Sequence, residues 1–346
     1  MDVLLISVQT TDAKGGIAVW TEHYLNSAAA HDIRCDLVNT ATVGKRAHNL
    51  TAKRSIKDEW IRTRRIMKYL TQVLKSKSYD VAHLNSSIGV FGIIRDYFIA
   101  KKIAKKKIPL CVHFHCDVPF WVTNGVVKWY LKRLLKLSEH VFVLCENSRK
   151  YLQDTFDVNA RKVPNFTDED LVVAQKTISD RIQRVFFVGR VSCLKGAKEI
   201  YELSKRFPNI DFCLAGEVAE DVAIWEREEN LHLLGALPHE EVLAQLDQAD
   251  VFLFPSYTEG FSIALAESMA RGVPSIATDV GANADMLEKF GGVIVPVGDV
   301  DAMQRAFEEL AAADIREQMS NWCLEKVRTQ YVTSKVMELF CEEYEK

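Results

Sequence analysis

The stretch "DVFLFPSYTEGFSIALAESMARGVPSIATD" (250–279) contains two short apolar runs that are separated by a segment with helical signals. The runs 250–255 and 274–279 are nearly continuous in apolar residues, as in parallel strands that are buried on both faces. Between them, Ser262 can cap the start of a helix, and Gly272 stands where that helix would end. The stretch therefore predicts a strand, a helix and a second parallel strand.

This stretch also carries two carboxylates, Glu259 and Glu267. On one continuous helix their side chains would lie about 80° apart, so they would not share a face. A helix that begins after Ser262 leaves Glu259 on the preceding loop, beside the free N–H groups of Gly260, Phe261 and Ser262. Those groups and the positive end of the helix dipole can hold an anion such as phosphate. The alternative is a surface carboxylate and a solvated helix position.

The rest of the chain repeats the alternation of short apolar runs with longer amphipathic segments. In the first half the expected strands are 2–8, 34–39, 80–85, 109–115 and 140–145. In the second half they are 184–189, 211–216, 231–235, 250–255 and 274–279. The predicted fold class is therefore α/β, with a Rossmann-like layer of parallel strands and crossover helices in each half.

At 346 residues the chain is longer than a single core usually supports, so two domains are expected. We place the N-terminal domain at 1–165 and the C-terminal domain at 184–325. The polar segment 166–183, which follows Pro164, is the expected linker. The amphipathic end of the chain, 326–346, is expected to form a helix that packs back on the N-terminal domain.

Composition excludes some classes of protein. Apolar residues make up 48% of the chain, charged residues 26%, and the net charge is −3, so there is no overall attraction to nucleic acid. The eight cysteines form no CxxC pair and are expected to be reduced core residues. No stretch of 18 consecutive apolar residues occurs, and a cytoplasmic location is expected.

Open parallel sheets bind ligands beyond the carboxyl ends of their strands, so the loops there carry the functional candidates. Gly15 and Gly16 follow the first strand and would let backbone N–H groups approach a phosphate or sugar, although a tight turn without ligand is the alternative. In "GRVSCLKG" (189–196), Arg190 and Lys195 suit a diphosphate, and two solvated basic residues are the alternative. The chain has no GxGxxG fingerprint after the first strand, which leaves a nicotinamide cofactor without specific support.

The segments "FVGRVSCLKG", "FCLAGE", "LHLLGALPHEEV", "ADVFLFPSYTEGFSIALAESMARGVPSIATDVG" and "GGVIVPVGD" follow one another in the second half. In this order they resemble the carboxyl-terminal domain of the retaining glycosyltransferases of family 4, including the paired glutamates of that family. The first half adds the double glycine, "HFHCD", and "VLCENSRKYL" before "VPNF", and it is similar to the family's first domain.

The resemblance implies a GT-B fold, in which two Rossmann-like domains face each other across a cleft. The second domain would hold a nucleotide-sugar donor and the first an acceptor. Arg190 and Lys195 match the basic pair that binds the donor diphosphate. Glu267 matches the glutamate that binds the ribose hydroxyls, and Glu259 the one that contacts the hydroxyls of the donor sugar.

The expected site residues fall into two groups. Those expected to be catalytic are His115, Arg190, Lys195 and Glu259. Those expected to bind the donor are Gly15, Gly16, Gly260, Phe261, Ser262 and Glu267. His115 matches a family histidine near the donor sugar, with a satisfied structural histidine as the alternative, whereas His113 is expected to face the opposite side of its strand as a core residue. Asp117 is a weaker candidate.

The family retains anomeric configuration, and its usual account is a same-face displacement in which the leaving phosphate takes the acceptor's proton. Because cationic side chains would neutralise the diphosphate, and no DxD motif or cluster of metal ligands is evident, we expect neither a metal nor another cofactor. The expected donor is a UDP-sugar rather than a GDP-sugar.

Two basic segments bear on the acceptor. Residues 126–140 mix aromatic and aliphatic residues with lysine and arginine, and 101–107 add five lysines. Such a helix can lie on an anionic membrane surface, or it can be a crossover helix with a solvated basic face. The first case would make the chain a peripheral enzyme at the inner face of the cell membrane, acting on a glycan or lipid-linked acceptor in polysaccharide, lipopolysaccharide or glycolipid synthesis. The competing functions are a catalytically inactive GT-B partner subunit and a nucleotide-sugar epimerase.

Overall fold

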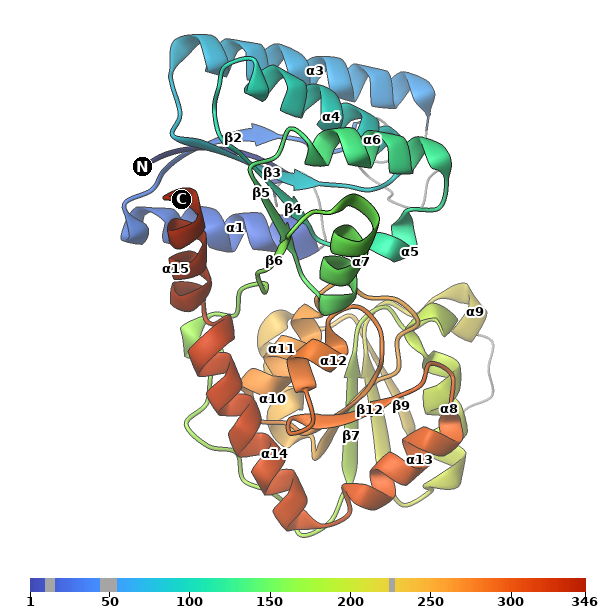
Figure 1. Ribbon diagram of the computed structural model, residues 1–346. Coiled ribbons are helices and arrows are strands. Elements are labelled where there is room, and N and C mark those ends of the chain that lie inside the picture. Colours follow the sequence, from blue (N-terminus) through green and yellow to red (C-terminus); the bar gives the residue numbers. More distant parts are fainter. Residues whose placement is uncertain (10–15, 44–54, 224–227) are drawn as a thin grey trace. The chain divides into compact units, whose positions relative to one another are not determined.

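The computed structural model describes residues 1–9, 16–43, 55–223 and 228–346 (Figure 1). Within these ranges no helix is long and apolar enough to cross a membrane.

The chain divides into two compact units. The first contains Met1–Phe166 and Thr333–Lys346, and the second contains Thr167–Val332. In the described residues, each unit has one six-stranded sheet whose paired strands are all parallel. The predicted α/β fold of two parallel sheets is thus confirmed.

The sheet of the first unit has the strand order β2-β1-β3-β4-β5-β6. Its strands are β1 (Asp2–Ser7), β2 (Arg34–Asn39), β3 (Val81–Ser86), β4 (Leu110–Phe114), β5 (His140–Val143) and β6 (Arg161–Lys162). Its helices are α1 (Gly16–Ala28), η2 (Ala29–His31), α3 (Ile56–Ser76), α4 (Val90–Ala104), α5 (Val118–Trp121), α6 (Gly125–Leu135), α7 (Glu146–Phe156) and α15 (Thr333–Tyr344).

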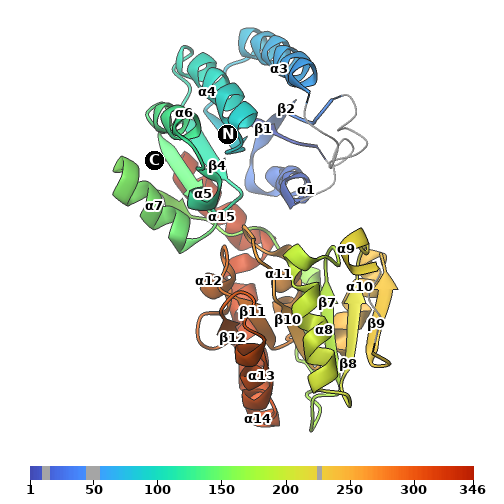
Figure 2. The same ribbon diagram turned by 90° about the vertical axis from the view of Figure 1, so that its right-hand side faces the viewer.

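Helices cover both faces of this sheet (Figures 1 and 2). On one face, α3, α4 and α6 bury an aliphatic core that includes Leu70, Ile99 and Leu131. On the other face α1 packs beside α15, and the aromatic residues Trp20 and Phe340 meet there with ring centroids 5.7 Å apart. The last helix of the chain is therefore part of the core of the first unit.

The sheet of the second unit has the order β12-β11-β10-β7-β8-β9. Its strands are β7 (Arg184–Val188), β8 (Asp211–Ala215), β9 (Leu231–Gly235), β10 (Val251–Phe254), β11 (Ser275–Thr278) and β12 (Gly292–Val295). Its helices are η3 (Glu169–Leu171), η4 (Cys193–Lys195), α8 (Ala197–Arg206), α9 (Glu220–Ala223), α10 (His239–Gln248), α11 (Ile263–Ala270), α12 (Asn283–Leu287), α13 (Val300–Glu309), α14 (Ala313–Lys326) and the π-helical turn η5 (Val327–Tyr331).

All ten strands expected from the sequence are present within a residue or two of their expected bounds. Two strands were not expected, β6 and β12. The first has two residues, too few for a periodic signal, and the second begins with Gly292 after Gly291, a residue type that is depleted in strands.

Residues 171–179 are fastened to the second unit through side chains that bond to backbone carbonyl groups. Arg271 Nη1 donates to the carbonyl of Leu171 at 3.2 Å, and Arg316 Nη2 donates to that of Ser179 at 2.8 Å. Arg328 Nη2 donates to the carbonyls of Val173 and Ala174 at 2.6 and 2.9 Å. This segment, which lies inside the expected linker, thus belongs to the body of the second unit.

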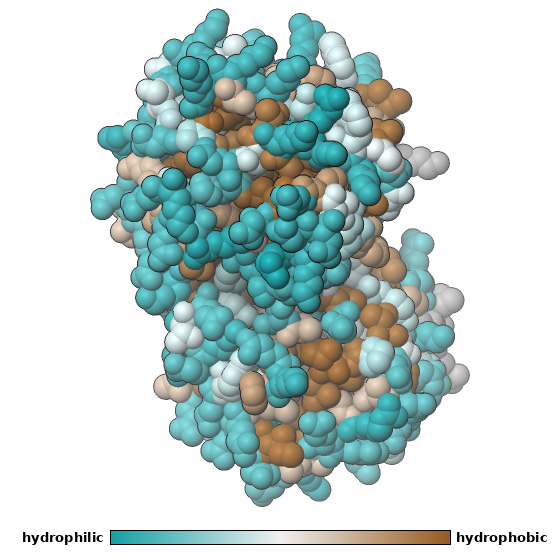
Figure 3. All heavy atoms as spheres, in the orientation of Figure 1, coloured by the Kyte–Doolittle hydropathy of each residue, from teal (hydrophilic) through white to brown (hydrophobic). Residues whose placement is uncertain are grey.

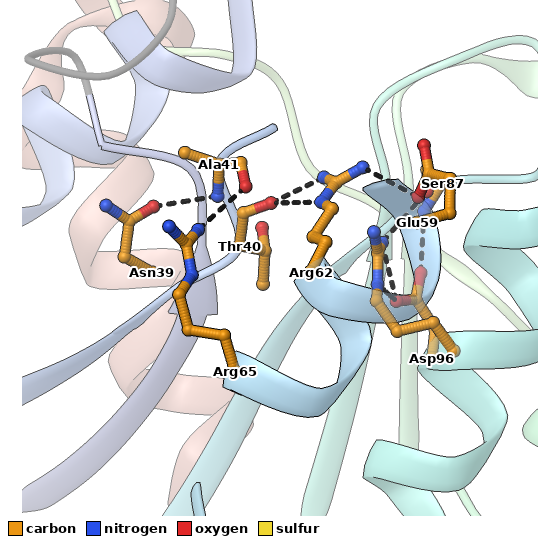
Figure 4. A network of polar contacts seen from close by, with 9 residues as sticks. Asn39, Thr40, Ala41, Glu59, Arg62, Arg65, Ser87 and Asp96 are labelled. Carbon is orange, nitrogen blue, oxygen red and sulfur yellow. Dashed lines mark hydrogen bonds and ion pairs between the residues drawn. The ribbon is translucent and has the colours of Figure 1, made fainter. Parts of the chain in front are cut away.

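In the first unit, arginines of α3 fasten that helix to the carboxyl end of β2 (Figure 4). The guanidinium of Arg62 donates twice to the carbonyl of Thr40, at 2.8 and 2.5 Å, and Arg65 donates to that of Ala41 at 2.9 Å. Burial and the neighbouring charge of Arg95 lower the pKa of Arg62 to about 10. Next to it, Asp96 is fully buried and pairs with Arg95 at 2.8 Å.

Candidate functional site

The loop between β10 and α11 carries the two glutamates of the opening stretch. The hydroxyl of Ser262 accepts a hydrogen bond from the N–H of Leu265 at 3.2 Å, which caps α11 as predicted. Gly272, one residue past the C-cap, has a φ of 67° and ends the helix. Glu259 therefore lies on the loop before the helix, and Glu267 lies within the helix.

This loop is held by a close backbone contact with Gly281. The N–H of Ala282 donates to the carbonyl of Gly260 at 2.8 Å. Gly281 has a φ of 56°, and a Cβ atom there would lie 2.5 Å from the oxygen of Gly260 and 2.6 Å from that of Glu259. Only glycine fits this position, because a side chain would displace the loop.

The side chain of Phe261 anchors the same loop. It is 8% exposed, and its ring meets that of Tyr331 edge-on, with centroids 5.4 Å apart. Phe261 can therefore offer a ligand its backbone N–H, while its ring belongs to the core of the second unit.

The loop after β7 lies against the β10–α11 loop. Gly196, at a φ of 80°, packs so closely on Pro255 that a Cβ atom would lie 2.4 Å from the proline carbonyl oxygen. The N–H of Tyr257 donates to the carbonyl of Leu194 at 3.1 Å. Two backbone contacts thus fix the position of Lys195, which lies between Leu194 and Gly196.

These contacts bring Lys195 and Glu259 together. The ammonium nitrogen of Lys195 lies 2.6 Å from Oε1 of Glu259, and the two side chains are 31% and 12% exposed. A cation and a carboxylate, 64 residues apart in the chain, meet at the carboxyl ends of β7 and β10. This ion pair lies where an open parallel sheet binds ligands.

Arg190 is exposed on the same β7 loop. Asp221, at the start of α9, accepts a hydrogen bond from the N–H of Cys193 at 3.1 Å. That hydrogen bond lowers the pKa of Asp221, and the charge of Arg190 lowers it further. Among the described residues, the structure joins Arg190 to neither Lys195 nor Glu259 by a hydrogen bond or an ion pair.

Glu267 has a partner that sequence reasoning missed. Nε2 of His239, the first residue of α10, lies 3.0 Å from Oε1 of Glu267. The hydrogen bond to Glu267, with further help from the charges of Glu267, Asp168 and Glu240, raises the pKa of His239. The sequence "LPHEEV" placed a histidine four residues after the carboxyl end of the expected strand 231–235, which was the available signal.

A second pair that the sequence did not reveal joins residues close in the chain to Lys195 and Glu259. The hydroxyl of Tyr257 donates to Oε1 of Glu199 at 2.6 Å, and Glu199 is 4% exposed. The bond to Glu199 and burial raise the pKa of Tyr257 to about 12. Glu199 follows Lys195 by four residues and Tyr257 precedes Glu259 by two, so this bond ties the same two loops together.

In the first unit, His115 follows β4 directly. Its Nε2 lies 3.0 Å from Oδ1 of Asn85, and its ring meets that of Trp20 at 5.1 Å. Burial lowers the pKa of His115 to about 3, so the imidazole is neutral.

The expectation that His113 faces the opposite side of the strand was wrong. The ring centroids of His113 and His115 are 4.0 Å apart, because residues two apart on a strand point to the same face. His113 is fully buried, as expected of a core residue, and burial holds its pKa well below the usual range.

The remaining candidates of the first unit differ in surroundings. Gly16 is the exposed first residue of α1, and Gly15 lies outside the described residues. Asp117 accepts hydrogen bonds from the Asn147 amide at 3.0 and 3.1 Å and from the Ser148 hydroxyl at 3.1 Å. Its carboxylate thus stabilises the first turn of α7, which is a structural role.

Family models match almost the whole chain. The model "Glycosyltransferase Family 4" matches residues 14–171, and the model "Glycosyl transferases group 1" matches residues 169–322. The chain belongs to glycosyltransferase family 4. It is accordingly a glycosyltransferase of the retaining, metal-independent type.

Two curated relatives share modest identity with this family 4 chain. A 41.2 kDa protein in the cps region of Klebsiella pneumoniae is 26% identical over 67% of this chain and 69% of its own length. The UDP-Gal:alpha-D-GlcNAc-diphosphoundecaprenol alpha-1,3-galactosyltransferase of Escherichia coli is 23% identical over 75% of this chain and 73% of its own.

Among solved structures, the sucrose-phosphate synthase of Thermosynechococcus elongatus has the same fold. It superposes with a TM-score of 0.80 at 17% identity and covers 99% of this family 4 chain and 98% of its own. The expected GT-B fold is thus confirmed.

Proposed function

We propose that this glycosyltransferase moves a sugar from a UDP-sugar to a glycan or lipid-linked acceptor during the synthesis of a cell-surface polysaccharide, lipopolysaccharide or glycolipid. The observation that carries the proposal is the 2.6 Å ion pair between Lys195 and Glu259 at the carboxyl ends of β7 and β10. One member can bind the diphosphate of the donor and the other the hydroxyl groups of its sugar.

The other donor contacts follow from the same loops. Arg190 is exposed after β7 and can bind the diphosphate through its planar fork of N–H groups. The N–H groups of Gly260, Phe261 and Ser262 precede the capped start of α11, where an anion is favoured. Glu267, in the second turn of α11, is assigned to the ribose hydroxyls.

These residues suit the chemistry of the transfer. The bond between the sugar C1 and the phosphate oxygen breaks while a bond from the acceptor oxygen to C1 forms on the same face. The departing phosphate takes the acceptor's proton. Negative charge grows on that phosphate, so Arg190 and Lys195 stabilise the transition state more than the ground state. Removing one such donor typically costs about 2.7–4 kcal/mol in the transition state.

His115 and Gly16 are assigned to the sugar end of the donor. A neutral imidazole can accept or donate a hydrogen bond but does not repel the positive charge that develops on the sugar ring. The lowered pKa of His115, to about 3, keeps it neutral at physiological pH.

The E. coli relative, whose acceptor carries a diphosphoundecaprenol lipid, supports a lipid-linked acceptor here. The first unit offers a surface that suits a membrane. Exposed apolar side chains lie on α4, α5 and α6, among them Phe91, Phe98, Phe120, Trp121, Val126 and Trp129. On the helix layer of this unit, apolar residues stand among hydrophilic ones (Figure 3).

Exposed basic residues lie on two of the same helices or at their ends. Lys101, Lys105, Lys106 and Lys107 are exposed at the end of α4, and Lys128, Lys132, Arg133 and Lys136 are exposed along α6. The guanidinium carbon of Arg133 lies 3.6 Å from the centroid of the Trp129 ring. Exposed rings beside cations are typical of segments that lie in a membrane interface, so we place the enzyme at the periphery of the inner face of the membrane.

Calorimetric titration of UDP, GDP and a panel of their sugars, with EDTA present, tests the donor site. We expect UDP and one UDP-sugar to bind in the micromolar range. Lys195→Ala and Glu267→Ala should each weaken UDP at least tenfold, about 1.4 kcal/mol. Lys198→Ala is the matched control. Lys198 is an exposed lysine at the start of α8, three residues after Lys195, and this variant should bind UDP as the wild type does.

Two results would contradict the proposal. If neither nucleotide binds to the folded wild type, the donor site is misplaced. If GDP binds tightly and UDP does not, the assignment of the base is wrong although the transferase assignment stands.

A further inference from the structure

The contact between His239 and Glu267 joins the first residue of α10 to the second turn of α11. Nε2 of His239 lies 3.0 Å from Oε1 of Glu267, and the side chains are 56% and 15% exposed. The carboxylate is therefore mostly withdrawn from water, while much of the imidazole remains open to solvent. Within the part of the chain that the structure describes, His239 is the one residue that bonds the Glu267 carboxylate.

The position of His239 is unfavourable for a cation by local rules. The first turn of a helix favours negative charge, and Glu240 and Glu241 follow that rule in α10. The pKa of His239 is nevertheless raised, first by the hydrogen bond to Glu267 and also by the charges of Asp168 and Glu240. The hydrogen bond to Glu267 and these charges thus favour the protonated form of His239, in which the contact is an ion pair.

An ionised carboxylate has two oxygens and about four acceptor positions. With Oε1 bonded to His239, the carboxylate keeps acceptor positions for further hydroxyl donors, and its orientation is set by the histidine. A carboxylate that must accept from two neighbouring hydroxyl groups gains from being fixed before the ligand arrives, because less side-chain entropy is then lost on binding.

We propose that His239 is a positioning residue of the ribose site: it holds the Glu267 carboxylate oriented for the vicinal 2′- and 3′-hydroxyl groups of the donor nucleotide. The inference rests on the proposed function, which assigns Glu267 to the ribose. It adds that the preference for a ribonucleotide over a 2′-deoxyribonucleotide depends on a histidine that itself need not touch the ligand.

The test compares UDP with 2′-deoxy-UDP by calorimetry in the wild type and in His239→Ala and His239→Gln. His239→Ala should weaken UDP roughly fivefold, the size of one lost hydrogen bond, and should weaken 2′-deoxy-UDP less, so that the ratio between the two ligands narrows. His239→Gln keeps a neutral N–H donor, so its affinity for UDP should lie between those of the wild type and His239→Ala. His239→Ala should add no further loss in a Glu267→Ala background, since its effect passes through that carboxylate.

A matched control is available in the same unit. Nε2 of His232 lies 3.0 Å from Oδ1 of Asp211, and the side chains are 44% and 56% exposed. This pair resembles the first in geometry but lies at the other end of its strands, so His232→Ala should leave both affinities unchanged.

A pH series gives a readout that a merely structural role would not move. The ratio of UDP affinities between the wild type and His239→Ala should decline as the pH rises and His239 loses its proton. The ligand's own ionisation cancels in this ratio. The charged groups that face His239 are Glu267, Asp168 and Glu240.

The inference is overturned if His239→Ala binds UDP as the wild type does, or if it weakens UDP and 2′-deoxy-UDP equally. Either result would leave the donor site intact as long as Glu267→Ala still weakens UDP. If Glu267→Ala also has no effect, the assignment of Glu267 to the ribose falls, and the role of His239 falls with it.

Discussion

The ammonium group of Lys195 lies 2.6 Å from the carboxylate oxygen Oε1 of Glu259, so the residue assigned to the diphosphate of the donor forms an ion pair with the residue assigned to its sugar. A diphosphate that binds Lys195 must draw the cation away from Glu259 or share it. The released carboxylate is then available to accept hydrogen bonds from the sugar hydroxyls.

Because Glu259 competes with the diphosphate for Lys195 but binds the sugar, its replacement should affect UDP binding and sugar transfer differently. Glu259→Gln removes the competing charge, so we expect UDP to bind at least as tightly as to the wild type. Turnover should fall roughly tenfold to a hundredfold, because hydrogen bonds to a charged partner contribute about 1.5–3 kcal/mol. Calorimetry with UDP and a transfer assay would measure both. Glu202→Gln, in an exposed pair on α8, is the control, and equal losses of UDP affinity and turnover in Glu259→Gln would contradict the exchange.

The hydrogen bond from Tyr257 to Glu199 should contribute to stability. Tyr257→Phe leaves a carboxylate that is 4% exposed without this donor, and we expect the free energy of unfolding to fall by about 1–3 kcal/mol. Glu199→Gln keeps an oxygen that can accept the bond, so it should cost less. Urea unfolding of both variants measures the difference, and a Tyr257→Phe protein as stable as the wild type would show that the bond contributes nothing.

Gly281 should tolerate no side chain. Gly281→Ala combines a left-handed backbone, about 1–2 kcal/mol, with a clash against the carbonyls of Glu259 and Gly260, so both stability and UDP affinity should fall. Gly235→Ala is the matched control, because Gly235 has a φ of 71° but no atom near its added Cβ. It should lose stability alone. Indistinguishable UDP affinities in the two variants would contradict the role of Gly281 in holding the loop.

Three histidines of the first unit, two of them buried and His115 half-buried, should make the stability of the protein depend on pH. Burial lowers the pKa of His83 and of His115 to about 3 and that of His113 well below its usual range. The unfolded chain takes up these protons near pH 6.5 and the folded chain does not, so the folded state loses stability as the pH falls from about 6.5 towards 3. Each histidine contributes at most about 1.4 kcal/mol per pH unit.

Urea unfolding at pH 7, 6 and 5 checks this slope. His113→Phe should reduce the slope of the free energy of unfolding against pH. It should not lower stability at pH 7, since both ring nitrogens of His113 are buried without a hydrogen-bond partner among the described residues. His232→Gln, an exposed histidine, should leave the slope unchanged. A wild-type stability that is flat between pH 7 and 5 would contradict the argument.

The basic face of α6 should bind anionic membranes. We expect the wild type to sediment with vesicles of equal parts phosphatidylglycerol and phosphatidylcholine, and 0.5 M salt should release it. Changing Lys128, Lys132 and Lys136 to glutamate should abolish binding, since each basic residue near the surface contributes about 1 kcal/mol. The Lys198→Glu/Lys205→Glu variant, altered in the second unit, is the control. A wild type that stays in the supernatant would remove the membrane from the proposal.

Local signals in the sequence predicted most of the fold. The runs 250–255 and 274–279 form strands, and the helix between them begins after Ser262 and ends before Gly272. Helix caps and buried strands could be predicted because each depends on residues that are close together in the sequence. The two-residue β6 was missed because it is a strand only through its pairing with β5, and β12 was missed because it begins with a glycine, which weakens the strand signal.

Contacts between residues far apart in the chain could not be predicted from the sequence. Lys195 and Glu259 could each be named as candidates, but their pairing depends on how Gly196 packs against Pro255. The partners His239 and Glu199 were missed, since each is an ordinary helix residue until tertiary packing supplies Glu267 or Tyr257. The error at His113 came from applying the strand period incorrectly, and no tertiary information was needed to avoid it.

The last helix, α15, has a consequence for how the protein is made. Val336, Met337 and Phe340 complete a core whose other members come from residues 3–166. On the ribosome residues 3–166 emerge before the second unit, yet they cannot close this core until α15 has been translated. The second unit is one continuous stretch, Thr167–Val332, and can fold as soon as it has emerged. The half of the protein that is synthesised first is therefore the half that is finished last.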